Sequence, residues 1–259
     1  PEQICLAWAA RRLGALLRWQ QNRSEAFVAD LHGRDNRSQA SAMIDEHGRI
    51  HAMKVTVHAN MGAWLSNFST YIPTMSGCRT LTTIYDIPAT SLRVIGVVTN
   101  TPAVDAYRGA GRPEATYLLE RLVDRAAREM GMSQTDIRRK NFIPADAFPY
   151  QTPVALQYDS GDYGATLDSA MKMADVDGFE ARRTAAAKNG KFRGIGYSTY
   201  VEACGIAPSA VVGSLGARAG LFECAEVRVH PTGSVTIFTG SHSHGQGHET
   251  TFAQLVVER

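Results

Sequence analysis

A glycine-spaced stretch has the strongest chemical character in this 259-residue sequence. It reads TGSHSHGQGHETT over residues 239–251, follows a strand-like alternation, and leads into a helix-like apolar pattern. A strand–loop–helix turn exposes backbone N–H groups and the positive end of a helix dipole, which together bind phosphate. Gly245 and Gly247 would let the backbone approach a ligand, and Gln246 would add side-chain hydrogen bonds. The stretch therefore predicts either a phosphate-bearing ligand or a plain tight turn.

The same stretch permits a second interpretation, a zinc-dependent hydrolase. His242, His244 and His248 have an H-x-H-x3-H spacing, and imidazoles two residues apart on a strand face the same side. However, the loop holds no aspartate beside them, and its two glycines favour backbone contacts with a ligand over side-chain ligation. We therefore assign no metal ligands and keep the zinc site as an alternative hypothesis.

A second glycine-rich stretch, DAYRGAGRPE over residues 105–114, precedes the clearest helical pattern of the chain. Arg108 and Arg112 stand just before the expected helix N-terminus, and arginine forks beside helix-end N–H groups suit an anionic or strongly polar ligand. Alternatively, the two arginines pair with Asp105 and Glu114 inside an ordinary loop. The residues alone leave both interpretations open.

Apolar spacing predicts the elements that position these stretches. β-Hairpins are expected over residues 38–60, with a turn at Asp45–Gly48, and over residues 225–238. Helices are expected over residues 2–13, 113–130, 162–173 and 178–188, and Ser133 is placed to cap a further short helix. The charged face of the helix at 113–130, which includes Asp124, is expected to be solvated. Hairpins at both ends and helices between them predict a mixed α+β fold.

Composition excludes several classes of function. A formal net charge of +2 gives no electrostatic case for a nucleic-acid partner, and no apolar run is long enough to span a membrane. The four cysteines, Cys5, Cys78, Cys204 and Cys224, form no C-x-x-C pair. We expect them to be small buried residues in a protein of the reducing cytoplasm.

Taken together, three stretches resemble one protein family. The loop AYRGAGRPEA over residues 106–115 is similar to the active-site loop of large subunits of the xanthine dehydrogenase/aldehyde oxidase family of molybdenum hydroxylases. It is especially similar to carbon monoxide dehydrogenase large-chain homologues. The stretch SHGQGHETT over residues 243–251 resembles their molybdopterin-binding loop. The turn HGRD over residues 32–35 precedes the Arg108 loop, as the corresponding turn does in the order of motifs along those subunits. The resemblance implies an α+β fold with two molybdenum-binding subdomain segments, residues 1–150 and 151–259.

The resemblance also implies roles for individual residues. Arg108 would contact the molybdenum cofactor and stabilise developing negative charge, and Gln246 would lie in the loop around the pterin and its phosphates. Arg34 stands where related enzymes carry a catalytic, substrate-orienting arginine, and Ala110 stands in the substrate pocket, where xanthine enzymes carry an aromatic ring. Residues 205–207 would lie near the opposite pocket wall. The other implied cofactor-binding residues are Tyr107, Gly109, Ser243, His244, Gly245, Gly247, His248 and Thr250.

The implied activity is hydroxylation of an aldehyde or N-heterocycle, with water as the oxygen source. The implied cofactor is molybdopterin with Mo, as the cytosine dinucleotide. Electrons would pass to a 2Fe-2S small subunit and an FAD-binding medium subunit in a dimer of heterotrimers. The family's catalytic glutamate and a further cofactor loop are expected outside these 259 residues, so the chain is expected to be an internal fragment that is inactive alone. A carbon monoxide dehydrogenase-type subunit and a non-catalytic scaffold that binds nucleotide phosphate remain the alternatives.

Two residues restrict the implied chemistry. Carbon monoxide dehydrogenases carry a copper-binding cysteine directly after the loop arginine, whereas this chain has Gly109, which supplies no thiolate. Ala110 lacks the ring that xanthine enzymes place over their substrate, which argues against purine substrates.

Overall fold

The structure is a computed structural model that describes residues 2–202, 213 and 223–258. It divides into two units, Pro1–Val201 and Glu202–Arg259, and each is described here by itself. Residues 205–207, the predicted pocket wall, and Cys204 lie outside the described residues. The predicted division near residue 150 concerns cofactor-binding segments and stays a prediction.

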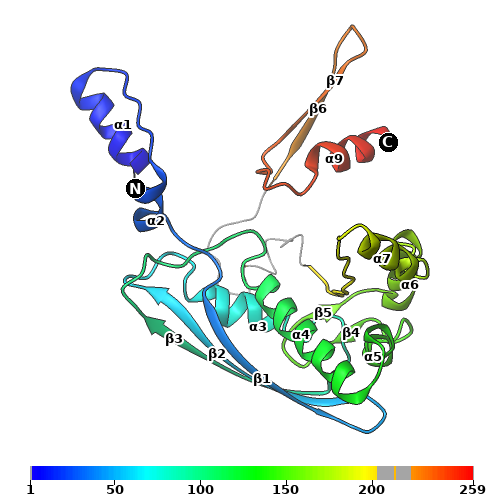
Figure 1. The fold of residues 1–259 in the computed structure, drawn as a ribbon. Helices are drawn as coiled ribbons and strands as arrows, with labels where there is room; N and C mark the ends of the chain where they lie inside the picture. Colours follow the sequence, from blue (N-terminus) through cyan, green and yellow to red (C-terminus); the bar gives the residue numbers. More distant parts are fainter. Residues whose placement is uncertain (1, 203–212, 214–222, 259) are drawn as a thin grey trace. The chain divides into compact units, whose positions relative to one another are not determined.

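A three-stranded sheet forms the base of the first unit (Figure 1). Its strands are β1 (Asn36–Ile44), β2 (Ile50–Gly62) and β3 (Ala89–Val98), in the order β1-β2-β3. The first two pair antiparallel and confirm the predicted hairpin, while β3 returns parallel to β2. The Asp45 carboxylate makes the hairpin turn by accepting the backbone N–H groups of His47 and Arg49 at 3.0 and 2.9 Å.

The first unit also contains helices. The predicted helices are present as α1 (Glu2–Leu13), α4 (Arg112–Met130), α6 (Tyr163–Met173) and α7 (Phe179–Lys188). Ser133 caps α5 (Gln134–Asn141) as predicted, by accepting the backbone N–H of Asp136 at 3.0 Å. The remaining elements of this unit are α2 (Arg23–Ala29), the π-helix η1 (Ile72–Ser76), α3 (Gly77–Arg79), β4 (Tyr150–Gln151) and β5 (Gln157–Tyr158).

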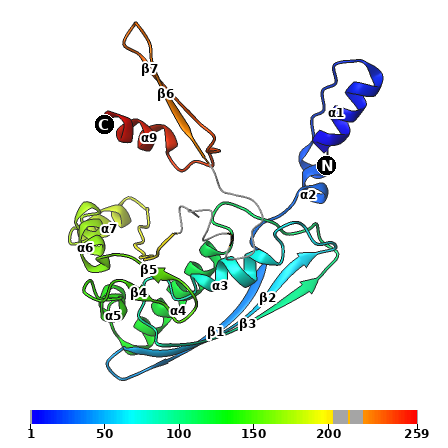
Figure 2. The same ribbon diagram turned by 180° about the vertical axis from the view of Figure 1, so that it is seen from behind.

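The core lies where α4 packs on one face of this sheet (Figures 1 and 2). Burial follows the predicted apolar stripe of the helix, and Leu119 and Val123 are fully covered. Each such side chain contributes roughly 1.5–3 kcal/mol of transfer free energy. From the sheet, Met53 and Val55 complete the contact. Helix α4 is therefore held rigidly along its length, and the Arg108 loop leads directly into its first turn.

A buried network of charged groups crosses this core. Arg138 of α5 is fully buried, and its guanidinium donates to Glu120 at 3.0 and 2.8 Å and to Asp124 at 2.8 Å. Asp124 was predicted to be solvated, but this contact leaves its side chain only 14% exposed, which corrects that prediction. Burial, followed by the Glu120 charge, raises the pKa of Tyr85, so its hydroxyl stays protonated and donates to Glu120 at 2.5 Å.

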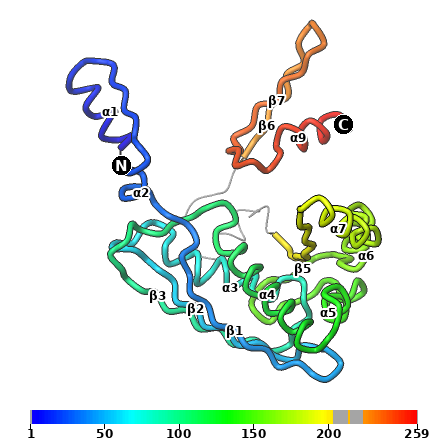
Figure 3. The backbone as a smooth tube through the Cα atoms, viewed as in Figure 1, coloured from blue at the N-terminus to red at the C-terminus, as the bar shows by residue number. Residues whose placement is uncertain are grey.

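The second unit has a simple arrangement in its described part (Figure 3). Strands β6 (Ala225–Val229) and β7 (Val235–Thr239) form the predicted antiparallel hairpin. Helix α9 (His248–Val257) follows the glycine-spaced loop. The Glu223 carboxylate fastens the start of that loop by accepting the hydroxyls of Thr239 and Ser241 at 3.2 and 2.7 Å.

The cysteines differ from expectation. Cys5 and Cys224 are exposed thiols and Cys78 is half-buried, so the expectation that all four are buried is wrong. Cys5 lies in α1 and Cys224 directly precedes β6, and neither element contains a buried side chain, which explains the difference. Among the described residues, no helix combines the length and apolar character needed to cross a membrane.

Candidate cofactor-binding site

The HGRD turn and the Arg108 loop lie side by side in the first unit. His32 and Val104 form a parallel β-bridge. The backbone N–H of His32 donates to the Ala103 carbonyl at 3.0 Å, and that of Asp105 donates to the His32 carbonyl at 2.8 Å. Two stretches that lie about 70 residues apart in the sequence are therefore joined by backbone hydrogen bonds.

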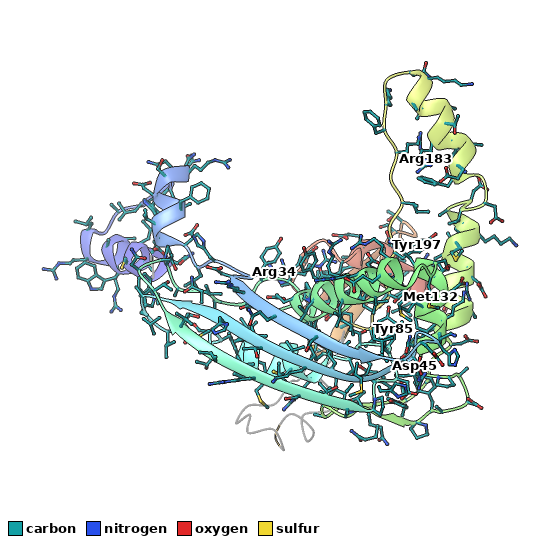
Figure 4. The ribbon with its side chains drawn as sticks, turned by 60° about the horizontal axis from the view of Figure 1, so that its bottom comes forward. Arg34, Asp45, Tyr85, Met132, Arg183 and Tyr197 are labelled. Atoms are coloured by element: carbon teal, nitrogen blue, oxygen red, sulfur yellow. The ribbon has the colours of Figure 1, made fainter. Side chains whose placement is uncertain are left out.

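Arg34 reaches from this turn to the Arg108 loop (Figure 4). Its guanidinium lies 4.4 Å from the centroid of the Tyr107 ring, within the range of a cation–π contact, and donates to the backbone carbonyl of Arg108. Its Nε lies 3.8 Å from a carboxylate oxygen of Glu114. The structure thus gathers four residues at the start of α4, and three of them, Arg34, Tyr107 and Arg108, were predicted site residues.

Three consecutive residues of the loop adopt left-handed backbone conformations. The φ angles are +92° at Gly109, +38° at Ala110 and +95° at Gly111, and glycine adopts such angles without a Cβ clash. A Cβ added to Gly111 would lie 2.7 Å from the backbone N of Gly77 and from the carbonyl O of Ile72. The loop is therefore pressed against the η1–α3 segment, and this contact sets its path.

The outer side of the loop faces solvent. Tyr107 and Arg108 are exposed, Gly109 and Ala110 are half-buried, and Gly111 is buried. A small apolar hollow lies behind the loop, between it and the sheet. Its lining includes Gly77, Cys78 and Gly111 but neither Arg34 nor Ala110. The predicted site residues of the first unit therefore do not line this hollow.

The Gln246 loop of the second unit is also shaped by glycine. Gly245 and Gly247 have φ angles of +84° and +81°. The Gln246 side chain folds over its own loop, where its amide oxygen accepts the His244 N–H and its nitrogen donates to the His242 carbonyl at 3.3 Å. A Cβ added to Gly247 would meet no atom within 4 Å. Open space therefore lies beside the backbone at the start of α9.

The three histidines of this loop do not converge. The rings of His242 and His244 pack edge to face, with centroids 4.6 Å apart, whereas His248 stacks on Phe252 at 4.7 Å. In the described part of the chain, no group of three His, Cys, Asp or Glu side chains is placed to hold a metal ion. The geometry therefore does not favour the zinc hypothesis.

The predicted site residues form two groups, one in each unit. Arg34, Tyr107, Arg108, Gly109 and Ala110 lie together in the first unit, and residues 243–250 lie together in the second. That the two groups meet around one ligand stays a prediction.

Sequence reasoning missed two contributors to the first group. Gly33 was named within the HGRD turn but given no role, although a Cβ there would lie 2.7 Å from the Cβ of Tyr107. Glu114 was considered only as a partner for Arg108 or Arg112, yet it lies beside Arg34. The position of Glu114 in the first turn of the helix predicted over residues 113–130 was the sequence feature that could have indicated a role at the start of that helix.

Both groups fit a phosphorylated pterin. The first presents arginine cations at a helix N-terminus, and such groups bind anions. The second presents a glycine-shaped backbone with open space at the start of α9, which permits close approach by a phosphate. These donors are main-chain N–H groups, guanidinium and amide, which suit hydrogen bonding to an organic cofactor better than direct ligation of a metal.

Comparison with known proteins decides the family. Family models of the molybdopterin cofactor-binding domain match residues 1–142 and residues 169–259. The chain belongs to the molybdopterin cofactor-binding family. The family resemblance inferred from the glycine loops and the α+β fold class are thereby confirmed. Each of the two glycine loops lies inside one of the matched ranges of this family.

Individual members of the family extend the match along the whole chain. The carbon monoxide dehydrogenase large chain of Hydrogenophaga pseudoflava is 34% identical over 99% of this chain and 32% of its own length. The nicotine 6-hydroxylase large subunit of Paenarthrobacter nicotinovorans is 32% identical over 100% of this chain and 32% of its own length. The crystal structure of quinoline 2-oxidoreductase from Pseudomonas putida 86 matches with a TM-score of 0.81 and 32% identity, covering 99% of this chain and 33% of that one. The chain thus spans about a third of the length of these oxidoreductases.

Proposed function

We propose that this chain is the cofactor-binding part of a molybdenum hydroxylase large subunit, in which the Arg108 and Gln246 loops hold one molybdopterin. The observation that carries the proposal is the position of these loops. One lies in each range that matches a molybdopterin cofactor-binding domain, and both have the glycine-dependent backbone that close approach to a ligand requires.

The cofactor is proposed to be molybdopterin with Mo, as the cytosine dinucleotide. When bound, it supplies the redox chemistry that this chain's side chains cannot perform. Arg108 places a cation beside the anionic cofactor and stabilises negative charge that develops in the reaction. The residues around Gln246, from Ser243 to Thr250, bind the pterin and its phosphates through backbone N–H groups and short polar side chains.

The reaction is proposed to be hydroxylation of an aldehyde or an N-heterocycle. Two of the oxidoreductases similar to this chain are named for N-heterocycles, nicotine and quinoline. Ala110 and Gly109 are small, so the loop leaves room for a ring beside the cofactor. A copper-dependent carbon monoxide dehydrogenase is disfavoured because Gly109 offers no thiolate for copper.

The partners are proposed to be a 2Fe-2S small subunit and an FAD-binding medium subunit, in a dimer of heterotrimers in the cytoplasm. The relatives are named as a large chain or a large subunit, which implies smaller companions in those proteins. Arg34, Arg108 and Ala110 are proposed to lie at the substrate end of the site.

The proposal is tested by measuring molybdenum and the released pterin nucleotide in the full-length protein isolated with its companions. We expect about one molybdenum per large subunit. Arg108→Ala should lower kcat about 10²- to 10³-fold, as expected when one charge-stabilising donor is removed. Gln246→Ala should lower the amount of pterin nucleotide that the protein retains. Arg125→Ala, an exposed change on α4, should leave kcat and nucleotide retention unchanged.

The alternatives predict different results. A nucleotide-binding scaffold would retain the pterin nucleotide but reduce no dye with any aldehyde or N-heterocycle. A zinc hydrolase would contain zinc that is lost when His242 and His244 are replaced together. Absence of molybdenum from the intact protein would refute the proposed function.

A further inference from the structure

We propose that Arg34 is a positioning residue that holds the Arg108 loop in its cofactor-binding conformation, rather than a residue that orients substrate directly. This inference deepens the proposed function. It rests on the proposed function in one respect, that the Arg108 loop binds the cofactor. The inference concerns contacts within the first unit alone.

The guanidinium of Arg34 contacts the loop in three ways. Its Cζ lies over the ring of Tyr107, 4.4 Å from the centroid, one N–H donates to the Arg108 carbonyl, and Nε lies 3.8 Å from a Glu114 carboxylate oxygen. An arginine can satisfy all three at once because its fork is flat, rigid and always charged. These contacts engage Nε and Nη2 and hold the guanidinium against the loop and the first turn of α4.

The backbone on both sides of Arg34 is pinned to other elements. On one side, His32 forms the bridge to Val104 and exchanges hydrogen bonds with residues 103 and 105. On the other, the Asp35 carbonyl accepts the backbone N–H of Asn60 at 2.9 Å, and its carboxylate accepts the Asn60 side-chain amide at 2.7 Å. Arg34 itself has a φ of +59°, a conformation that side-chain-bearing residues keep only when their surroundings fix it. The turn therefore aims this side chain at the loop.

Two glycines make the approach between turn and loop possible. A Cβ at Gly33 would clash with Tyr107 at 2.7 Å, so the backbone of the turn lies directly against that residue. A Cβ at Gly109 would lie 2.5 Å from Cγ of Pro113 and 3.6 Å from Nη2 of Arg34. The guanidinium thus lies beside Gly109, a loop residue that bears no side chain.

Glu114 connects this contact to the helix. Its carboxylate accepts the backbone N–H of Gly111 at 3.0 Å, the reciprocal half of a capping box, and also faces Arg34. The Glu114 side chain is only 17% exposed, so solvent screens this pair less than an open surface pair. Arg34 and Glu114 together hold both ends of the segment 108–111.

The test is hydrogen–deuterium exchange of the peptide covering residues 105–114 in the full-length protein. In Arg34→Gln, we expect the amides of Ala110 and Arg112, which donate to Tyr107 and Gly109, to exchange at least tenfold faster. Glu114→Gln should give a similar change. Arg37→Gln, an exposed change three residues away on β1, is the matched control and should leave the peptide unchanged. If Arg34→Gln does not fold, Arg34→Lys, which keeps the charge but loses the fork, should show a smaller acceleration.

Kinetics separate positioning from substrate binding. With a neutral aldehyde and the same aldehyde bearing a carboxylate, a positioning role lowers kcat by the same factor for both substrates. Unchanged exchange of residues 105–114, or a KM that rises only for the carboxylate substrate, would overturn the inference. A wild-type protein without molybdenum would instead refute the proposed function, while the exchange measurement would still report whether Arg34 holds the loop.

Discussion

At the scale of single residues, the buried Arg138–Glu120 pair shows how much of this core depends on charge. Arg138 is the largest fully buried side chain among the described residues. Its partner Glu120 also accepts the backbone N–H of Thr199 at 3.0 Å, and Arg138 donates to the carbonyl of Tyr197 at 3.1 Å. The pair therefore connects α4 and α5 to residues 197–199 (Figure 4 labels Tyr197). Removing either charge alone leaves the other buried with less charge compensation.

We therefore predict that Glu120→Gln lowers the free energy of unfolding by about 3 kcal/mol, because it leaves a buried guanidinium undercompensated. Glu129→Gln, on the same helix, breaks only the exposed pair with Arg125 and should cost under about 0.5 kcal/mol. Urea unfolding of both variants measures the difference. Equal losses would show that the buried pair contributes no more than a surface pair.

Asp45 gives the clearest pH-dependent contact. Hydrogen bonds from His51 and then from the backbone N–H of Arg49 lower the pKa of its carboxyl from 3.8 to about 2. Because the folded-state pKa is depressed, the stabilisation is complete above the unfolded-state pKa of roughly 3.9 and is lost as pH falls toward 2.

Replacing His51 tests this assignment. We predict that His51→Ala moves the pKa of Asp45 back toward 3.8, followed by the NMR titration of its carboxyl carbon, while the two backbone donors keep part of the shift. His58→Ala, farther along the same strand, should leave the titration in place. An unchanged Asp45 titration in His51→Ala would assign the shift to the backbone donors instead.

At the scale of elements, the sequence predicted structure whose signals lie within one stretch, but not the pairing of strands that are distant in the sequence. Helix α4 was predicted because its apolar stripe, Pro113 and Gly131 all lie within one stretch of sequence. Strand β3 was missed because alternation breaks at Ile95–Gly96 and its partner β2 lies far back in the sequence. The π-helix η1 was missed because Pro73 argues against a helix except in its first turn, where it is found.

The candidate site divides in the same way. The two glycine loops were predicted because their residue types and spacing are local. The contact of Arg34 with the Arg108 loop was not, because 74 residues separate the partners and nothing in the spacing of either stretch indicates the other. Similarly, the buried role of Glu120 depends on Arg138, which belongs to another helix.

The two ends of α4 allow a matched test of the close approach at the loop. Gly111 and Gly131 both have positive φ, but only the Cβ of an alanine at Gly111 would clash with backbone, at Gly77 and Ile72. We predict that Gly131→Ala costs about 1 kcal/mol from backbone strain alone. Gly111→Ala should cost at least about 2 kcal/mol more, because packed backbone must move. Thermal unfolding compares the stability of the two variants. Similar losses of unfolding free energy would mean that the loop is not pressed against η1–α3.

At the scale of the whole molecule, the described chain consists of two units that each carry one glycine loop. The first unit has an extensive core, whereas no side chain in β6, β7 or α9 is buried. Apolar side chains of these elements, such as Val229 and Val257, are exposed. We expect ligand binding to involve both units, because each loop supplies only part of the hydrogen-bond donors that a dinucleotide cofactor needs.

The most direct measurement is an experimental structure of the full-length, molybdenum-loaded protein, from which the atoms around the pterin are read. We predict hydrogen-bond contacts from the Arg108 loop and from the Gln246 loop to the same cofactor molecule. A cofactor held by only one of the loops, with the other facing solvent or a different ligand, would contradict the shared site.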